Sequence, residues 1–256
     1  MSCFYAQPTC TPKQTKEHVI SNAVLKVVFG NPIRNVVSAN HLGDKVLIDN
    51  EPVIKDVCTH CNNVALSPYD VAGVSLVNQL SGHDATGLRL QVSADTFGWM
   101  LKTHLNHIRV IKDAEYKDVY PISQILKDGL IRKESFPHGQ FKLYVEGWQG
   151  EDFYWDENDK RKIHWFQYRS IRFKSQRIVL SDFRIKTLTT WVLLPSDNDY
   201  ESFDERASSV LAEVKNDFGS DLQSVDTTQA INDGYLDITQ ILSLESIKKF
   251  IYKKTS

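Results

Sequence analysis

The sequence predicts an α+β protein in which zinc stabilises the N-terminal segment and helices and β-sheet together form the remainder. Three observations support this fold class. All four cysteines of the 256 residues lie near the N-terminus, an apolar stripe with helical spacing runs through residues 93–112, and residues 121–194 are rich in β-branched and aromatic side chains. We therefore expect two regions, residues 1–80 and residues 81–256.

The overall composition is that of a globular protein, with 41% hydrophobic and 24% charged residues. A net charge of −2 and a pI near 6.4 argue against a protein that coats nucleic acid through its total charge, so any basic surface has to be local. No apolar run approaches the ~18 residues that a membrane-spanning helix needs. Because the cysteines cluster at metal-like spacing, we expect the reducing cytoplasm rather than a disulfide framework.

The cysteines form two pairs that bracket an acid-imidazole step. Cys3 and Cys10 precede the dipeptide Glu17-His18, and Cys58 and Cys61 follow it. Two pairs of soft ligands are typical of a structural zinc site, in which four thiolates close the coordination shell and leave no position for water. A zinc ion enclosed in this way could not itself activate a water molecule.

These residues, with Asn62 directly after Cys61, resemble the HNH (His-Me finger, ββα-metal) endonucleases, and most closely the endonuclease VII-like zinc-containing subgroup. The resemblance covers about residues 1–70 and implies a zinc-stabilised ββα-metal finger. It also implies that His18 is the general base and that Glu17 and Asn62 are oxygen ligands of Mg²⁺ or Mn²⁺. The implied ligands of the structural Zn²⁺ are Cys3, Cys10, Cys58 and Cys61.

The chain departs from the family pattern in one place and leaves one role open. The family usually opens with Cys-x-x-Cys, whereas Ala6 stands where the second thiolate is expected; either Cys10 completes the site through a longer loop, or the site has three ligands. The family also uses a middle asparagine to buttress the catalytic histidine. Asn35, Asn40 and Asn50 all lie in the right interval, and spacing does not choose among them.

The chemistry of these side chains agrees with that assignment. Phosphodiester hydrolysis needs a nucleophile near neutral pH and a cation that stabilises the charge building on the phosphate. An imidazole titrates in the useful range, and a carboxylate with a carboxamide offers the oxygen ligands that Mg²⁺ prefers.

Two helices are expected on either side of residue 80. Ser67 and Pro68 suit a helix start, and Asp70 in that helix is a spare carboxylate that we expect to cap or to face solvent. In the helix predicted over residues 93–112, Lys102, Asn106 and Arg109 share one face, which either contacts phosphates or is simply solvated. For His104 and His107 we expect packing or solvent rather than metal.

Residues 121–194 are predicted to be β-rich, and basic side chains concentrate between residues 160 and 186 among aromatic ones. Such strands either present phosphate-binding charge on one face or form an ordinary solvated sheet face. The candidate nucleic-acid-binding residues are Lys102, Arg109, Arg169, Arg172, Lys174 and Arg177.

The last region is expected to be helical over residues 205–218 and 236–252, and could bind a protein partner or a second copy of the chain. The function that the resemblance favours is a metal-dependent endonuclease that cleaves DNA, for which a prokaryotic or phage defence nuclease is one option. DNA is favoured over RNA as the substrate, although the sequence itself does not separate the two. Two alternatives stay open: a zinc-binding interaction module without catalysis, and an RNase that uses the same finger.

Overall fold

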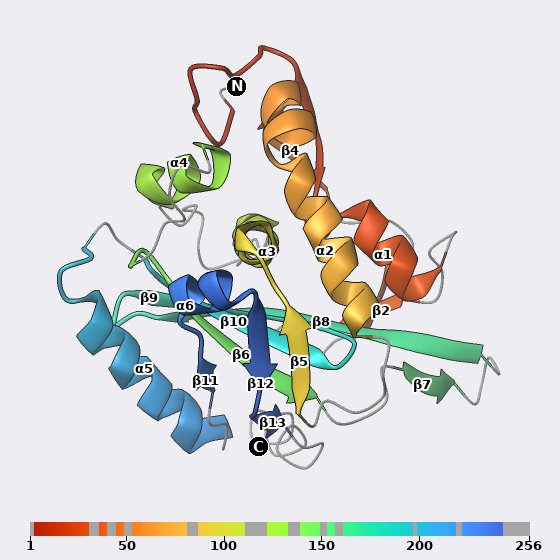
Figure 1. Ribbon diagram of the computed structural model, residues 1–256, viewed down its shortest axis with the longest axis vertical. Coiled ribbons are helices and arrows are strands. Elements are labelled where there is room, and N and C mark those ends of the chain that lie inside the picture. The colour runs from red at the N-terminus through yellow and green to blue at the C-terminus, as the bar shows by residue number, and fades with distance from the viewer. Residues whose placement is uncertain are drawn as a thin grey trace.

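The computed structural model has an α+β fold. It describes residues 3–30, 36–39, 45–48, 53–80, 87–110, 122–132, 139–148, 153–156, 161–196, 199–218 and 222–242. A twisted sheet crosses the molecule, with α5 (Phe203–Phe218) against one face and α3 (Ala94–Val110) against the other (Figure 1). Within the described residues, no helix has the length and apolar character needed to cross a membrane.

The N-terminal segment contains a pair of antiparallel strands that come from well-separated stretches of the chain. β1 (Gln14–His18) runs beside β4 (Val53–Cys58), so that Gln14 lies opposite Cys58 and His18 lies opposite Val53. The register shifts between Thr15 and Glu17, which marks a bulge. Bulges re-aim side chains, and directly after this one Glu17 points into the protein interior.

Helices follow both strands. α1 (Asn22–Phe29) comes directly after β1, and the π-helical turn η1 (Cys61–Ala65) leads from β4 into α2 (Ser67–Gln79). The predicted helix start at Ser67 and Pro68 is confirmed, although the Ser67 hydroxyl does not cap the helix and instead donates to the Val64 carbonyl. The second cysteine pair therefore lies where β4 turns into helix.

α2 and α3 pack together through two reciprocal contacts between glycine and an aromatic ring. A Cβ atom on Gly73 of α2 would lie 2.4 Å from the Trp99 ring, and one on Gly98 of α3 would lie 2.4 Å from the Tyr69 ring. Each glycine leaves room for the ring that the facing helix supplies. The Tyr69 hydroxyl also donates to the Leu130 carbonyl in α4 (Gln124–Arg132), so all three helices meet here.

α3 is the helix that the 3.6-residue periodicity predicts, and its N-terminus is capped by Ser93 and Thr96, whose hydroxyls each accept from the other residue's backbone N–H. The apolar stripe predicted one buried face. Instead, every residue from Thr96 to Ile108 is buried, polar ones included. The polar face of α3 therefore lies against other parts of the protein.

The main sheet combines a C-terminal antiparallel meander with strands from the N-terminal segment. The central strands run in the order β6 (Lys142–Trp148), β10 (Leu188–Pro195), β9 (Ile178–Ile185) and β8 (Arg161–Phe173). The remaining strands of this sheet are β2 (Val36–Ala39) and β3 (Lys45–Ile48) beyond β8, β7 (Phe153–Asp156) also on β8, and β11 (Gln223–Ser224) and β13 (Ile241–Leu242) on β6. β2 pairs with β8 in parallel, and β3 pairs with β2. Two strands from the stretch between the two cysteine pairs therefore extend the C-terminal sheet.

Side chains alternate between two cores on the two faces of this sheet. In β6, Leu143 and Val145 join the core that includes α3, whereas Tyr144 between them joins the core formed with α5. The α3 core also contains Cys58 and Cys61. One continuous apolar core thus joins the cysteine-containing segment to the sheet.

Two sequence predictions of secondary structure were wrong. Residues 124–132, inside the stretch predicted to be β-rich, form α4, whose first turn is capped by Ser123. Residues 236–242 were predicted to be helical but lie in β12 (Tyr235–Ile238) and β13. β12 follows α6 (Thr227–Asp233) and pairs with β5 (Leu88–Gln91), a partner more than 140 positions away that local periodicity does not reveal.

Candidate functional site

The four cysteine sulfurs form one cluster between the N-terminal loop and the junction of β4 with η1. Their Sγ atoms all lie within 4.8 Å of one another, and Cys10 Sγ is 3.7 Å from Cys61 Sγ. A tetrahedral zinc with Zn–S bonds of ~2.3 Å separates its sulfurs by ~3.8 Å. The cluster could therefore hold a metal ion such as zinc, and Cys10 provides the fourth sulfur. Within the described part of the chain, no other group of His, Cys, Asp and Glu side chains is close enough to do so.

Backbone N–H groups are aimed at three of these sulfurs. Gln7 N donates to Cys10 Sγ at 3.2 Å, Cys58 N to Cys3 Sγ at 3.4 Å, and Cys61 N to Cys58 Sγ at 3.5 Å. Burial alone would raise the pKa of Cys58, but backbone N–H groups and neighbouring thiols lower it to about 6. Such donors stabilise thiolates, which are the form that binds metal.

Glu17 of β1 lies in the protein interior, with 1% of its surface exposed. Its Oε1 is 2.8 Å from Lys102 Nζ and accepts a hydrogen bond of 3.2 Å from Asn106 Nδ2, both from α3. Its Oε2 is also buried and makes no hydrogen bond within the described part of the chain. One carboxylate oxygen is therefore engaged by α3 and the other is left for a further partner.

Lys102 bridges two carboxylates from different elements. Its Nζ lies 2.8 Å from Glu17 Oε1 and 2.7 Å from Asp70 Oδ1 at the start of α2. Burial alone would lower the pKa of Lys102, but the two carboxylates outweigh burial and raise it. Lys102 is therefore an ammonium ion that ties β1 and α2 to α3.

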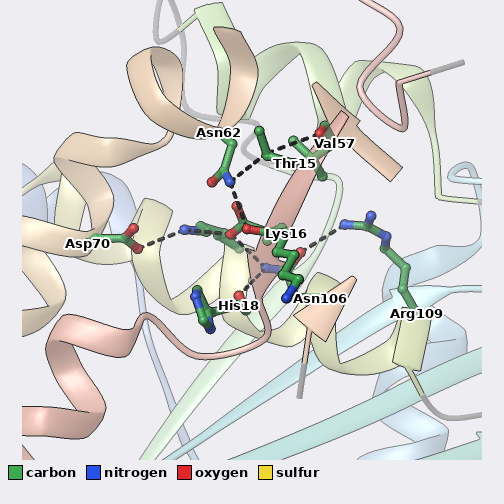
Figure 2. Close-up of polar contacts among 10 residues, drawn as sticks. Thr15, Lys16, His18, Val57, Asn62, Asp70, Asn106 and Arg109 are labelled. Atoms are coloured by element: carbon green, nitrogen blue, oxygen red, sulfur yellow. Dashed lines mark hydrogen bonds and ion pairs between the residues drawn. The ribbon is translucent and has the colours of Figure 1, made fainter. Parts of the chain in front are cut away.

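A second polar contact joins α3 to β4. Arg109 pairs with Asp56 of β4, stacks on the Phe4 ring at 3.7 Å and donates to Asn106 Oδ1 at 2.8 Å. The contacts that link Arg109, Asn106, Glu17, Lys102 and Asp70 form one chain of polar interactions around β1 (Figure 2). α3 thus contacts both β1 and β4 as well as α2.

His18 and Asn62 lie on either side of the exposed Lys16. His18 is the last residue of β1 and is half-buried, and its carbonyl accepts from Asn106 Nδ2 at 3.2 Å. Asn62, in η1, donates through Nδ2 to Thr15 Oγ1 at 2.9 Å and to the Lys16 carbonyl at 3.1 Å. η1 is therefore fastened to the strand that carries Glu17 and His18 (Figure 2).

Each of the two residues that were expected to bind Mg²⁺ or Mn²⁺ has one side-chain oxygen outside the contacts described so far. Both hydrogen bonds of Asn62 use Nδ2, which leaves Oδ1 as a possible ligand, and Glu17 keeps Oε2. Mg²⁺ is commonly bound through one or two protein oxygens together with water. Lys102 already neutralises the charge of Glu17. A divalent cation bound by Glu17 would therefore have to share that carboxylate with an ammonium group.

The structure corrects the expectation of an exposed basic face on α3. The side chains of Lys102 and Arg109 are 2% and 3% exposed and paired with acidic residues. The face that Lys102, Asn106 and Arg109 share is real, but it packs against β1, β4 and α2. These two cations are not available to phosphates at the protein surface in this conformation.

The other candidate phosphate-binding residues lie at the end of β8 and in its turn to β9. Lys174 and Arg177 in the turn are exposed and Arg172 is half-buried. Arg206 of α5 donates to the Gln176 and Arg177 carbonyls, which anchors this turn. Arg169 lies within β8, opposite Asp182 of β9, and its side chain is outside the described part of the structure.

Sequence reasoning missed the role of Asn106 and treated Asp70 only as a spare surface or capping carboxylate. The sequence showed that Asn106 shares a helix face with Lys102, but it did not predict which residues that face contacts. Asn35, Asn40 and Asn50 lie outside the described residues. His104 and His107 pack in the core as expected: both accept or donate a hydrogen bond with Ser181 Oγ, at 2.9 and 3.2 Å.

No protein-family model matches this chain, and no curated protein or solved structure shows significant similarity to it.

Proposed function

We propose that this protein is a zinc-stabilised endonuclease of the ββα-metal type that hydrolyses DNA phosphodiester bonds. The observation that carries the proposal is the attachment of η1 to β1. Through Asn62 Nδ2, the helical turn that begins at Cys61 donates to the Thr15 hydroxyl and to the Lys16 carbonyl, directly before the Glu17-His18 dipeptide. This turn carries Cys61 of the cluster that could hold zinc, and its carboxamide is bonded to the strand that carries the acid and the imidazole.

In this proposal His18 accepts the proton from an attacking water, since its half-buried position leaves it accessible and its strand is held in place. Glu17 Oε2 and Asn62 Oδ1 hold a divalent cation, which supplies positive charge for the phosphate and the leaving oxygen. Lys102 places an ammonium group 2.8 Å from the buried Glu17 carboxylate. The exposed Lys174 and Arg177, with Arg172 and Arg169, contact the phosphates of the substrate.

The test is incubation of the purified protein with supercoiled plasmid and, separately, with total RNA, in Mg²⁺, in Mn²⁺ and in EDTA. We expect cation-dependent cleavage of the plasmid. His18→Ala should retain zinc and fold but lose about 10²- to 10⁴-fold in rate. His60→Ala is the matched control, because His60 is a half-buried histidine of the same segment that is absent from the proposed machinery.

Variants of the two proposed metal ligands distinguish the role of metal binding from the role of general base. Glu17→Ala and Asn62→Ala remove oxygen ligands rather than the proton acceptor, so excess Mg²⁺ or Mn²⁺ should partly restore their cleavage and should not restore that of His18→Ala. Full activity in well-folded His18→Ala would reject the mechanism. Cleavage of RNA alone would favour the RNase alternative.

A zinc-binding interaction module without catalysis is the second candidate. Its support is the ion cluster itself: Glu17 is almost fully buried, and Lys102 provides a positive charge between it and Asp70. A site already neutralised by a lysine has less need of a metal cation. Absence of cleavage on both substrates in every metal, with zinc bound and the protein folded, would favour this candidate.

A further inference from the structure

Asn106 makes three hydrogen bonds that together use both ends of its amide. Nδ2 donates to Glu17 Oε1 and to the His18 carbonyl, each at 3.2 Å, and Oδ1 accepts from Arg109 Nη1 at 2.8 Å. The side chain is completely buried and lies on α3, well outside residues 1–70. A fully buried amide that binds the acid and the residue beside it is an unusual use of a core position, because most buried core positions carry apolar side chains.

We infer that Asn106 is a positioning residue that holds the Glu17 side chain and the His18 backbone in place. The inference rests on the proposed function, and it adds a residue from a separate part of the chain to the site. One planar amide contacts the side chain of the acid and the backbone of the base. Asn106 therefore fixes these two groups relative to each other as well as relative to α3.

The local structure of β1 explains why such support is needed. The bulge between Thr15 and Glu17 interrupts the ladder with β4, and His18 is the last residue of the strand. Only two residue pairs, Glu17 with Ile54 and His18 with Val53, therefore hold β1 to β4 beyond the bulge. A functional side chain has to be held within about 0.5 Å of its productive geometry, and Asn106 supplies bonds at this end of the strand.

The orientation of the amide is set by Arg109. A guanidinium group has only donors, so the atom that it contacts must be Oδ1, and Nδ2 must then face β1. Arg109 is itself held by its ion pair with Asp56 and by the Phe4 ring. Because Asp56 belongs to β4, the contacts of Arg109 and Asn106 tie both β1 and β4 to α3.

The experiment compares Asn106→Leu, which keeps the approximate shape and removes the three hydrogen bonds, with Thr103→Val on the same helix. Thr103 is also buried, at 2% exposure, and has no part in the proposed machinery. Zinc content and the midpoint of urea unfolding establish the folded fraction. Backbone hydrogen exchange over residues 14–20, kcat and KM on plasmid DNA are then measured per folded molecule.

We expect Asn106→Leu to speed exchange over residues 14–20 at least tenfold and to lower kcat about 10- to 100-fold, with KM changed less than threefold. Thr103→Val should change neither quantity. A purely structural role would shift the unfolding midpoint and leave kcat per folded molecule intact. Equal exchange and kcat in the two variants would overturn the inference.

Two further measurements keep the test decisive. If Asn106→Leu fails to fold, the smaller polar variant Asn106→Ser replaces it. In the wild-type protein, the side-chain amide protons of Asn106 must exchange slowly with solvent, and rapid exchange would overturn the inference. If the wild-type protein cleaves neither DNA nor RNA, the proposed function fails. The exchange over residues 14–20 still decides whether Asn106 positions this step.

Discussion

Lys102 Nζ lies 2.8 Å from Glu17 Oε1, and each of these side chains is only 2% exposed. The pair joins α3 to β1 inside the core, and Lys102 also reaches Asp70 of α2. Two ions cost free energy to bury, and their attraction compensates only while both are present. The arrangement therefore makes the position of β1 depend on a residue that lies 85 positions after Glu17 in the sequence.

Removing this ammonium group should destabilise the protein strongly. Lys102→Met leaves Glu17 as an uncompensated buried charge, and we expect a loss of about 3–5 kcal/mol in the free energy of unfolding, measured with urea. Adding Glu17→Gln to Lys102→Met should recover part of the loss. The control is Lys142→Met, which breaks an exposed pair of 2.7 Å with Asp204 and should cost about 0–1 kcal/mol. Similar losses in the two single variants would contradict this account.

The contacts between α2 and α3 should tolerate no added methyl group. In Gly73→Ala and Gly98→Ala the new Cβ lies 2.4 Å from Trp99 or Tyr69, which are large buried rings held in the core. Overpacking of this kind costs about 1–3 kcal/mol or more. Ser75→Ala, on the exposed side of α2, should be neutral or slightly stabilising because alanine favours helix. Calorimetric or urea unfolding of the three variants checks the contrast.

The cysteine cluster predicts about one tightly bound zinc per chain. Metal analysis of protein purified without added metal should find it, and Cys58→Ser or Cys10→Ser should lose it together with stability, because binding to a structural site contributes to folding. Retention of zinc and of fold in Cys58→Ser would reject the site. Retention in Cys10→Ser alone would show that three sulfurs suffice.

Stability should fall in mild acid because of the buried histidine pair. Burial lowers the pKa of His104 to about 3, and burial together with His104 lowers that of His107 well below its usual value. Between pH ~6.5 and pH ~3 the unfolded chain therefore binds protons that the folded protein does not. Each histidine should reduce the free energy of unfolding by about 1.4 kcal/mol per pH unit as the pH falls through this window.

Urea unfolding at several pH values measures that slope. His104→Gln removes one titrating group and keeps polar atoms toward Ser181 and Thr190, so its slope should be smaller by about 1.4 kcal/mol per pH unit. Zinc release in acid affects the wild-type protein and the variant alike, and the difference between them isolates the histidine. Equal slopes would contradict the assignment.

The basic residues at the β8–β9 turn should control how binding responds to salt. On duplex DNA, the logarithm of affinity falls with the logarithm of salt concentration by ~0.9 per phosphate contact. Neutralising Arg169, Arg172, Lys174 and Arg177 together should flatten this slope. The matched control replaces Lys215 and Lys26, which lie on other elements, by glutamine. An unchanged slope would show that these residues do not contact phosphates and that the turn is an ordinary solvated surface.

The sequence alone determined the features that depend on local spacing. The Cys-x-x-Cys pair, together with Cys3 and Cys10 upstream, predicted a metal-binding cluster, because cysteine pairs at this short spacing are typical of structural zinc sites. The apolar periodicity of residues 93–112 predicted the helix α3, and runs of β-branched and aromatic residues predicted strands in the region of β8, β9 and β10.

Only the tertiary structure decided what the polar side chains contact. Lys102 and Arg109 share one face of α3 in any helical reading, and the sequence allowed that face to be solvated or to bind phosphates. It is buried because β1, β4 and α2 supply Glu17, Asp56 and Asp70 as partners. These residues lie 32 to 85 positions away, and charge pairing across such separations leaves no periodic pattern in the sequence. The same reason hid Asn106, whose partners Glu17 and His18 are brought to it only when α3 packs against β1.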